Sequence, residues 1–145
     1  MSNPRLLTLR AAGVLLVLAG LASCATLNRD GVMASVGGGS VAVRQGAPLV
    51  ISLAADSTAG YGWVLTSDPG NAVWLIGGTP DFAPEPVPAG VMGVGGTTTY
   101  RFRALDPGVV KLEFAYRPIL EKDAPAAKVV GYDVTVISGG WMNWF

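Results

Sequence analysis

The strongest structural signal in the sequence is the stretch TTTYRFRALDPGVVKLEFAY, residues 97–116. In both halves a large apolar side chain alternates with a polar one, as in Tyr-Arg-Phe-Arg (100–103) and Lys-Leu-Glu-Phe (111–114). Strict alternation is typical of a β-strand with one buried and one solvated face. The turn-forming triplet Asp106-Pro107-Gly108 separates the halves. The stretch therefore predicts two strands, at 97–104 and 109–116.

The same two-residue period recurs along most of the chain, and no stretch after the N-terminal segment keeps a helical period. Seven strands are predicted, at 41–44, 48–54, 61–67, 72–76, 97–104, 109–116 and 128–137. Seven short alternating strands in about 100 residues predict an all-β fold, an immunoglobulin-like antiparallel β-sandwich. The chain has one cysteine, so the sandwich has no internal disulfide. The longest loop is expected from Thr79 to Gly96.

Residues 1–23 are predicted to be a lipoprotein signal peptide. Two arginines, Arg5 and Arg10, precede a run of apolar and small residues at 11–23, which is typical of a secretory signal. The run ends in Leu-Ala-Ser-Cys (21–24), which resembles the bacterial lipobox and implies that Cys24 is lipidated. The alternative is an ordinary signal peptide with an incidental cysteine.

The rest of the chain divides into three parts. Residues 24–39 are small, polar and Gly-rich, and are expected to be a flexible tether. Residues 40–138 form the sandwich, and 139–145 are an aromatic C-terminal tail that could dock on the domain, bind a partner or touch a membrane interface. A lipid on Cys24 implies a membrane anchor in a bacterial cell envelope. Because Ala25 is not aspartate, the outer membrane is favoured, with the domain facing the periplasm or the surface.

Composition excludes several functions. The sequence has no histidine, so a Ser-His-Asp triad, a Cys-His pair and a His-ligated metal are all impossible. Without Arg5 and Arg10 the charged residues are 10 − 2 = 8 basic and 10 acidic, a formal charge of −2 that gives no electrostatic basis for binding nucleic acid. We expect a monomer that is not an enzyme and holds no cofactor or metal.

Three loop segments are more elaborate than their connecting task requires. They read Asp-Ser-Thr-Ala-Gly-Tyr (56–61), Gly-Val-Gly-Gly (93–96) and Arg-Pro-Ile (117–119). Their order and spacing resemble the chagasin-like inhibitors of papain-type cysteine peptidases, whose signature is Asn-Pro-Thr-Thr-Gly-Tyr, Gly-x-Gly-Gly and Arg-Pro-Trp. The resemblance covers about 41–136. In a sandwich the first and third segments lie at the same end, and the second can reach it.

The resemblance implies a reversible, non-covalent inhibitor that blocks the cleft of papain-like cysteine proteases, here tethered to a bacterial membrane. Thr58 would approach the catalytic cysteine, the segment 91–96 would run extended along the unprimed subsites, and Arg117 with Pro118 would lie on the primed side. The implied protease-binding residues are Asp56, Ser57, Thr58, Ala59, Gly60, Tyr61, Met92, Gly93, Val94, Gly95, Gly96, Arg117, Pro118 and Ile119.

Each feature also has a plain structural interpretation. The glycines could simply permit turns with positive φ, and Tyr61 and Trp63 could belong to the core because they share one strand face. The chain departs from the signature at Asp56 and Ile119. These departures favour the alternative function: a cell-envelope β-sandwich lipoprotein that binds another protein or a glycan through the same loops, without protease inhibition.

Overall fold

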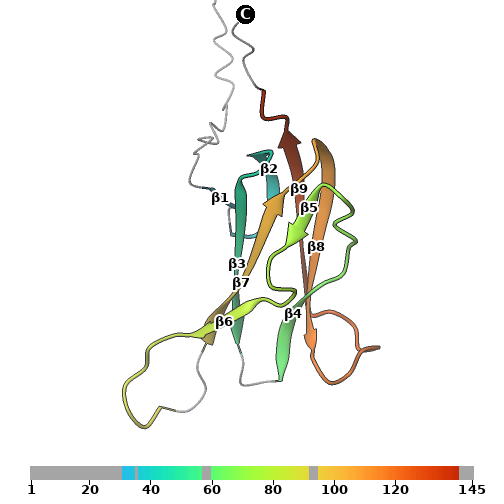
Figure 1. The fold of residues 1–145 in the computed structure, drawn as a ribbon. Helices are drawn as coiled ribbons and strands as arrows, with labels where there is room; N and C mark the ends of the chain where they lie inside the picture. The colour runs from blue at the N-terminus through green and yellow to red at the C-terminus, as the bar shows by residue number, and fades with distance from the viewer. Residues whose placement is uncertain (1–30, 35, 57–59, 92–94, 141–145) are drawn as a thin grey trace, which may run out of the picture.

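The structure is a computed structural model, and it describes residues 31–34, 36–56, 60–91 and 95–140. These residues form nine strands and no helix, so none of them forms a helix that could cross a membrane. The strands are β1 (Val32–Met33), β2 (Gly39–Arg44), β3 (Pro48–Asp56), β4 (Tyr61–Leu65), β5 (Val73–Leu75), β6 (Asp81–Pro84), β7 (Gly95–Ala104), β8 (Gly108–Pro118) and β9 (Lys128–Ile137) (Figure 1). All seven predicted strands are present.

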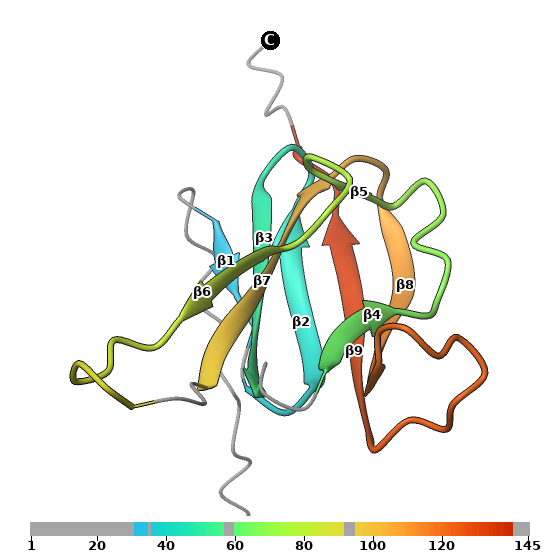
Figure 2. The ribbon, with the colours of Figure 1, turned by 90° about the horizontal axis from the view of Figure 1, so that it is seen from below.

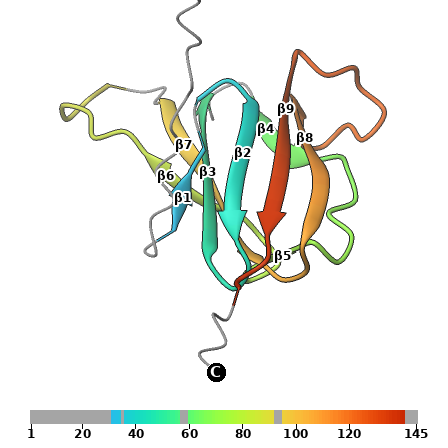
Figure 3. The same cartoon turned by 90° about the horizontal axis from the view of Figure 1, so that it is seen from above.

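The strands form two facing sheets (Figures 2 and 3). The first has the order β1-β3-β7-β5, with β6 also pairing with β7, and the second has the order β2-β9-β8-β4. The predicted β-sandwich is confirmed, but its strands are not all antiparallel: β1 runs parallel to β3, and β2 runs parallel to β9. Parallel pairing is possible here because neither pair is joined by a hairpin, which would force antiparallel neighbours.

The core lies between the two sheets and is centred on aromatic rings. Tyr100 and Phe102 on β7 face Phe114 on β8 and Tyr132 on β9, and all four side chains are at most 2% exposed. The ring centroids of Tyr100 and Phe114 are 4.7 Å apart, and those of Phe114 and Tyr132 are 6.0 Å apart. The alternation in residues 97–116 therefore does mark the buried faces of two strands.

The hydroxyl of Tyr100 also joins the two sheets. It donates a 2.8 Å hydrogen bond to the carbonyl oxygen of Trp63 on β4. Burial raises the pKa of Tyr100 to about 12, because the phenolate would lose its hydration.

Two strands lie where none was expected. β6 falls inside the predicted loop Thr79–Gly96; its four residues are all exposed, so no burial pattern marks it, and its pairing with β7 and an ion pair between Asp81 and Arg101 hold it in place. β1 falls inside the expected tether 24–39. Val32 is buried and pairs with Leu49, so the folded unit begins before the boundary expected at residue 40.

Candidate functional site

Three connections leave the sandwich at one end, which we call the loop end (Figures 1 and 2). They are the first loop between β3 and β4 (57–60), the second loop between β6 and β7 (85–94), and the third loop between β8 and β9 (119–127). Strand register fixes their order. Asp56 at the end of β3 pairs with Gly95 at the start of β7, and Tyr61 at the start of β4 pairs with Pro118 at the end of β8. The first loop therefore starts beside the end of the second loop and ends beside the start of the third.

Side chains of the second sheet hold the strand that leads into the first loop. The backbone N–H of Asp56 donates to the hydroxyl of Tyr116 at 2.9 Å, and the same hydroxyl donates to the carbonyl of Asp56 at 2.7 Å. Two residues earlier, the indole N–H of Trp63 donates to the carbonyl of Ala54 at 2.8 Å. The end of β3 is thus bonded to both β4 and β8 across the sandwich.

Aromatic contacts hold the side chains of Tyr116 and Trp63, which donate these hydrogen bonds, in place. The ring of Tyr116 lies 5.1 Å from that of Trp63 and 5.6 Å from that of Tyr61, measured between centroids. Trp63 is buried, while Tyr61 is half-buried at the rim. Trp63 is therefore both a core residue, as the plain interpretation held, and a support for the first loop.

Gly60 closes the first loop. Its φ of 70° lies in the left-handed region, where residues with a Cβ are strained, and its carbonyl accepts a 3.0 Å hydrogen bond from the N–H of Ile119. The end of the first loop is thereby bonded to the start of the third. Ser57, Thr58 and Ala59 lie outside the described residues.

The second loop is held differently from the expectation. Gly95 and Gly96 belong to β7: both pair with β3, Gly96 also pairs with Pro84 of β6, and the carbonyl of Gly95 accepts from the N–H of Glu85 at 2.9 Å. Neither glycine has a positive φ. Gly96 is thus paired within the chain on both sides and the carbonyl of Gly95 is already bonded, so these backbone groups are not available for pairing with an enzyme.

Packing explains why one of these positions is glycine. A Cβ on Gly96 would collide with the ring of Phe82 and lie 2.7 Å from the carbonyl oxygen of Ala83, whereas a Cβ on Gly95 would meet nothing closer than 3.7 Å. The close approach that glycine permits at residue 96 is therefore made by β6 of the same chain. Met92, Gly93 and Val94 lie outside the described residues.

The third loop presents aliphatic side chains. Ile119 is 61% exposed and lies over Gly62, where an added Cβ would come within 2.7 Å of its Cδ1 atom. Leu120, which the sequence reasoning did not single out, is 95% exposed. Its signal in the sequence was an aliphatic residue directly after Arg-Pro-Ile.

The base of the third loop is closed by hydrogen bonds. The guanidinium of Arg117 donates to the carbonyl of Lys122 at 2.8 Å, and the N–H of Ala127 donates to the carbonyl of Tyr116 at 2.8 Å. Arg117 and Pro118 are the last residues of β8 and are half-buried. Arg117 therefore holds the loop in shape rather than standing free in solvent.

Beneath the first and second loops the sheets leave a hollow of about 340 Å³. Its charged lining residues are Asp56, Glu85 and Lys128, and none of the described residues that line it is a serine, threonine, cysteine or histidine. No three Asp, Glu, Cys or His residues within the described ranges are grouped to hold a metal ion.

Comparison with known proteins finds a matching family model and similar solved structures. Residues 42–136 match the model of a family described as chagasin family peptidase inhibitor I42. A cysteine protease inhibitor from Entamoeba histolytica has a similar structure, with a TM-score of 0.59, 19% identity, and coverage of 70% of this chain and 88% of the other. Amebosin is similar too, with a TM-score of 0.56, 23% identity, and coverage of 72% and 97%. A search of curated proteins found no significant match.

Proposed function

The chain belongs to the chagasin family of peptidase inhibitors and is not an enzyme, and we propose that it reversibly blocks the active-site cleft of papain-like cysteine proteases. The observation that carries this proposal is the bonding of the first loop. β3 is held to the second sheet through Tyr116 and Trp63, and the loop's closing residue, Gly60, is bonded to Ile119. A loop fixed at both ends loses little conformational entropy on binding, which favours a non-covalent wedge.

We assign the central contact to the first loop, with Thr58 at its tip entering the cleft. The second loop contributes through residues 91–94, because Gly95 and Gly96 are already paired in the sheet. Flanking contacts on both sides of a central wedge exclude water from it, which strengthens binding at the centre of an interface.

The third loop supplies the other flank through Ile119 and Leu120. The family signature has tryptophan after Arg-Pro, and here Ile119 takes that position with its side chain turned onto Gly62. The Leu120 side chain is more exposed than that of Ile119, so we propose that Leu120 gives the apolar contact on this side. Arg117 acts as a positioning residue through its bond to Lys122.

Titration of papain and of a cathepsin with a protein of residues 25–145 tests the inhibitory function. This span holds every described strand and the whole buried core. We expect inhibition that competes with substrate, reverses on dilution and is abolished by Thr58→Arg, whose long cation cannot enter the cleft. No inhibition at micromolar concentration by a protein shown to be folded would overturn the proposal and leave the alternative of another protein or glycan at the loop end.

We also propose that the protein is a bacterial lipoprotein tethered to the outer membrane through Cys24. The path of the chain supports a tether that leaves the loops accessible. Val32 pairs with Leu49, seven residues before Asp56 on β3, so the N-terminal segment joins the sandwich roughly 23 Å from the first loop. Mass spectrometry of the envelope-extracted protein tests this: acyl chains on Cys24 support the proposal, and an unmodified thiol in the processed protein contradicts it.

A further inference from the structure

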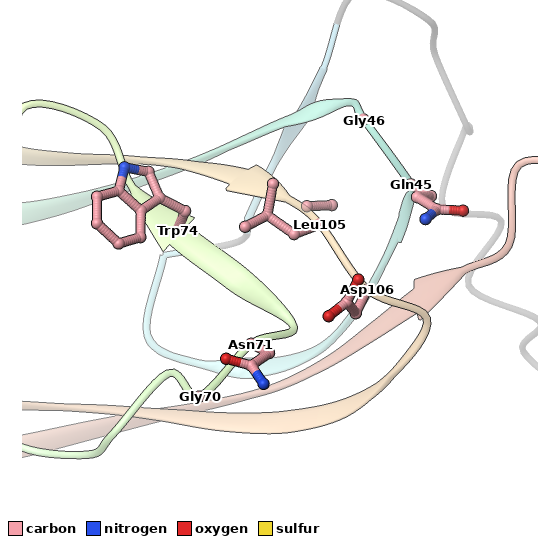
Figure 4. A pocket seen from close by; sticks show the side chains of 8 residues that line it. Gln45, Gly46, Gly70, Asn71, Trp74, Leu105 and Asp106 are labelled. Atoms are coloured by element: carbon pink, nitrogen blue, oxygen red, sulfur yellow. The ribbon is translucent and has the colours of Figure 1, made fainter.

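A pocket of about 490 Å³ opens at the end of the sandwich opposite the loops (Figure 4). We call it the turn pocket, because three turns form most of its lining. They are Gln45-Gly46 between β2 and β3, Gly70-Asn71 between β4 and β5, and Leu105-Asp106 after β7. Its volume lies within the range of roughly 300–1,000 Å³ that is typical of small-molecule sites. The inhibitory function proposed for the loops does not use it.

Backbone hydrogen bonds tie the three turns to one another. The N–H of Gly46 donates to the carbonyl of Ala104 at 2.8 Å, and the N–H of the next residue, Leu105, donates to the carbonyl of Ala72 at 2.8 Å. Ala72 directly follows Asn71, so the turn at 105–106 is bonded to both of the others. The lining is therefore held in place before a ligand arrives, which lowers the entropic cost of binding.

Trp74 of β5 gives the turn pocket one flat apolar wall. It pairs with Arg103 of β7, whose side chain is exposed, so Trp74 lies on the outer face of the first sheet. Its side chain is 65% exposed, and that of Leu105 beside it is 40% exposed. Figure 4 shows these two on one side of the pocket, with Asn71 and Asp106 on the other. The wall is thus open to a ligand and faces polar groups.

Three polar side chains complete this arrangement: Gln45, Asn71 and Asp106. All three are exposed, and neither they nor the indole N–H of Trp74 make a hydrogen bond to any described residue. The two amides donate and accept, the carboxylate accepts, and the indole N–H donates. A ligand can therefore bond to these groups without breaking a hydrogen bond within the described part of the chain.

A sugar ring matches this combination of groups. One face of a hexopyranose carries C–H groups, whose slight positive charge suits the negative face of the Trp74 ring. Its hydroxyls both donate and accept, as the amides of Asn71 and Gln45 do, and two neighbouring hydroxyls can donate to the Asp106 carboxylate. None of the described residues that line the pocket is lysine or arginine, so the negative charge of Asp106 disfavours an anionic sugar.

We propose that the turn pocket binds a neutral glycan, with one sugar ring packed on Trp74 and its hydroxyls bonded to Asn71, Asp106 and Gln45. This binding goes beyond the inhibitory function and does not depend on it. Because the pocket lies at the opposite end of the sandwich from the first loop, a bound glycan leaves the three loops free to reach a protease.

NMR titration of a labelled protein of residues 25–145 tests the proposal. The probes are chitotetraose, cellotetraose and maltotetraose, each added to about 10 mM, which detects dissociation constants in the millimolar range or below. We expect at least one of them to shift the resonances of the Trp74 indole N–H and the Asn71 side-chain amide, and the shifts to saturate. If none of the three shifts these resonances, the proposal is wrong.

Substitutions in the pocket and matched controls outside it locate the site. With the Asn71 amide as the probe, Trp74→Ala should weaken binding at least about fivefold, because the wall is removed. Asp106→Asn should weaken it about fivefold, because a charge-assisted hydrogen bond is lost. Ile76→Ala removes an exposed side chain two residues after Trp74, and Asp133→Asn removes an exposed carboxylate from β9; both should leave binding unchanged. Equal losses in pocket and control variants would overturn the proposal.

An organic cation is the other ligand that an exposed tryptophan with a nearby carboxylate suits. If tetramethylammonium chloride shifts the Trp74 resonance and the three oligosaccharides do not, the pocket is a cation site and the glycan proposal is wrong. All four variants should inhibit papain as the unsubstituted protein does. Failure of glycan binding and failure of inhibition are therefore distinguishable.

Discussion

The hydroxyl of Tyr116 accepts a hydrogen bond from the N–H of Asp56 and donates one to the carbonyl of the same residue, at 2.9 Å and 2.7 Å. The two residues are 60 positions apart and lie in opposite sheets. A single side chain thus takes the place of a neighbouring strand at the point where β3 enters the first loop.

Replacing Tyr116 with phenylalanine tests this link directly. The ring and its contacts with Trp63 remain, but both hydrogen bonds are lost, so we expect the free energy of unfolding to fall by about 1–2 kcal/mol. Inhibition should weaken about tenfold because the first loop is less preorganised. Urea denaturation and the inhibition constant with papain measure these effects. Tyr61→Phe is the control for stability: the Tyr61 hydroxyl makes no hydrogen bond to a described residue, and its removal should change little.

Gly96→Ala should be one of the most damaging changes in the second-loop region. The new Cβ would meet the Ala83 carbonyl oxygen at 2.7 Å as well as the Phe82 ring, and the backbone atom cannot move without breaking the β6–β7 pairing. We expect a loss of about 2–3 kcal/mol in the free energy of unfolding. Gly95→Ala has room for its Cβ and should cost less than about 1 kcal/mol. Equal losses would show that the β6 contact does not explain the glycine.

Leu120→Ala should weaken inhibition without changing stability. The side chain is 95% exposed in the free protein, so its removal leaves no cavity. If it is buried against a protease, its loss should cost about 1–2 kcal/mol of binding, or roughly five- to thirtyfold in the inhibition constant. Leu105→Ala makes the same change directly after β7, at the end of the sandwich opposite the loops, and should leave inhibition unaltered. An unchanged inhibition constant for Leu120→Ala would remove this residue from the contact surface.

Gly62→Ala should act through Ile119. The added Cβ would lie within 2.9 Å of two Ile119 side-chain atoms, and because that side chain can rotate, we expect a stability loss below about 1 kcal/mol. The displaced Ile119 should nevertheless weaken inhibition several-fold. In a protein that already carries Ile119→Ala, Gly62→Ala should have no further effect. A full effect in both backgrounds would place the cause elsewhere.

We expect the raised pKa of Tyr100 to make the folded protein less stable at high pH. Its pKa is about 12 in the folded protein and 10.0 for a tyrosine that is free in solvent, so above pH 10 the unfolded chain releases a proton that the folded protein keeps. Stability is therefore unaffected by this group below pH 10 and falls as the pH rises toward 12, by at most about 1.4 kcal/mol per pH unit. Urea denaturation between pH 8 and 11.5 measures the slope. Tyr100→Phe should have a shallower slope, and an identical slope would refute the assignment to Tyr100.

Strand positions could be read from the sequence because alternation along residues 48–54, 97–104 and 128–137 reports directly which side chains are buried. β6 could not be read in this way, since Asp81 to Pro84 are all exposed and are held only by pairing with β7. Val32 was missed for a related reason: a two-residue strand has no period, and its burial depends on the parallel contact with β3.

The sequence alone determined that the chain is a sandwich and that three unusual segments follow or precede its strands, because both properties are local patterns of residue type. The tertiary structure decided the rest. It showed that β7 and β8, which follow each other in the chain and carry the clearest alternation, belong to different sheets. It also assigned Gly96 to packing against β6, and it showed that Tyr116 supports the first loop from 60 residues away. Such contacts join residues distant in the chain, and their free energy depends on geometry that no local period encodes.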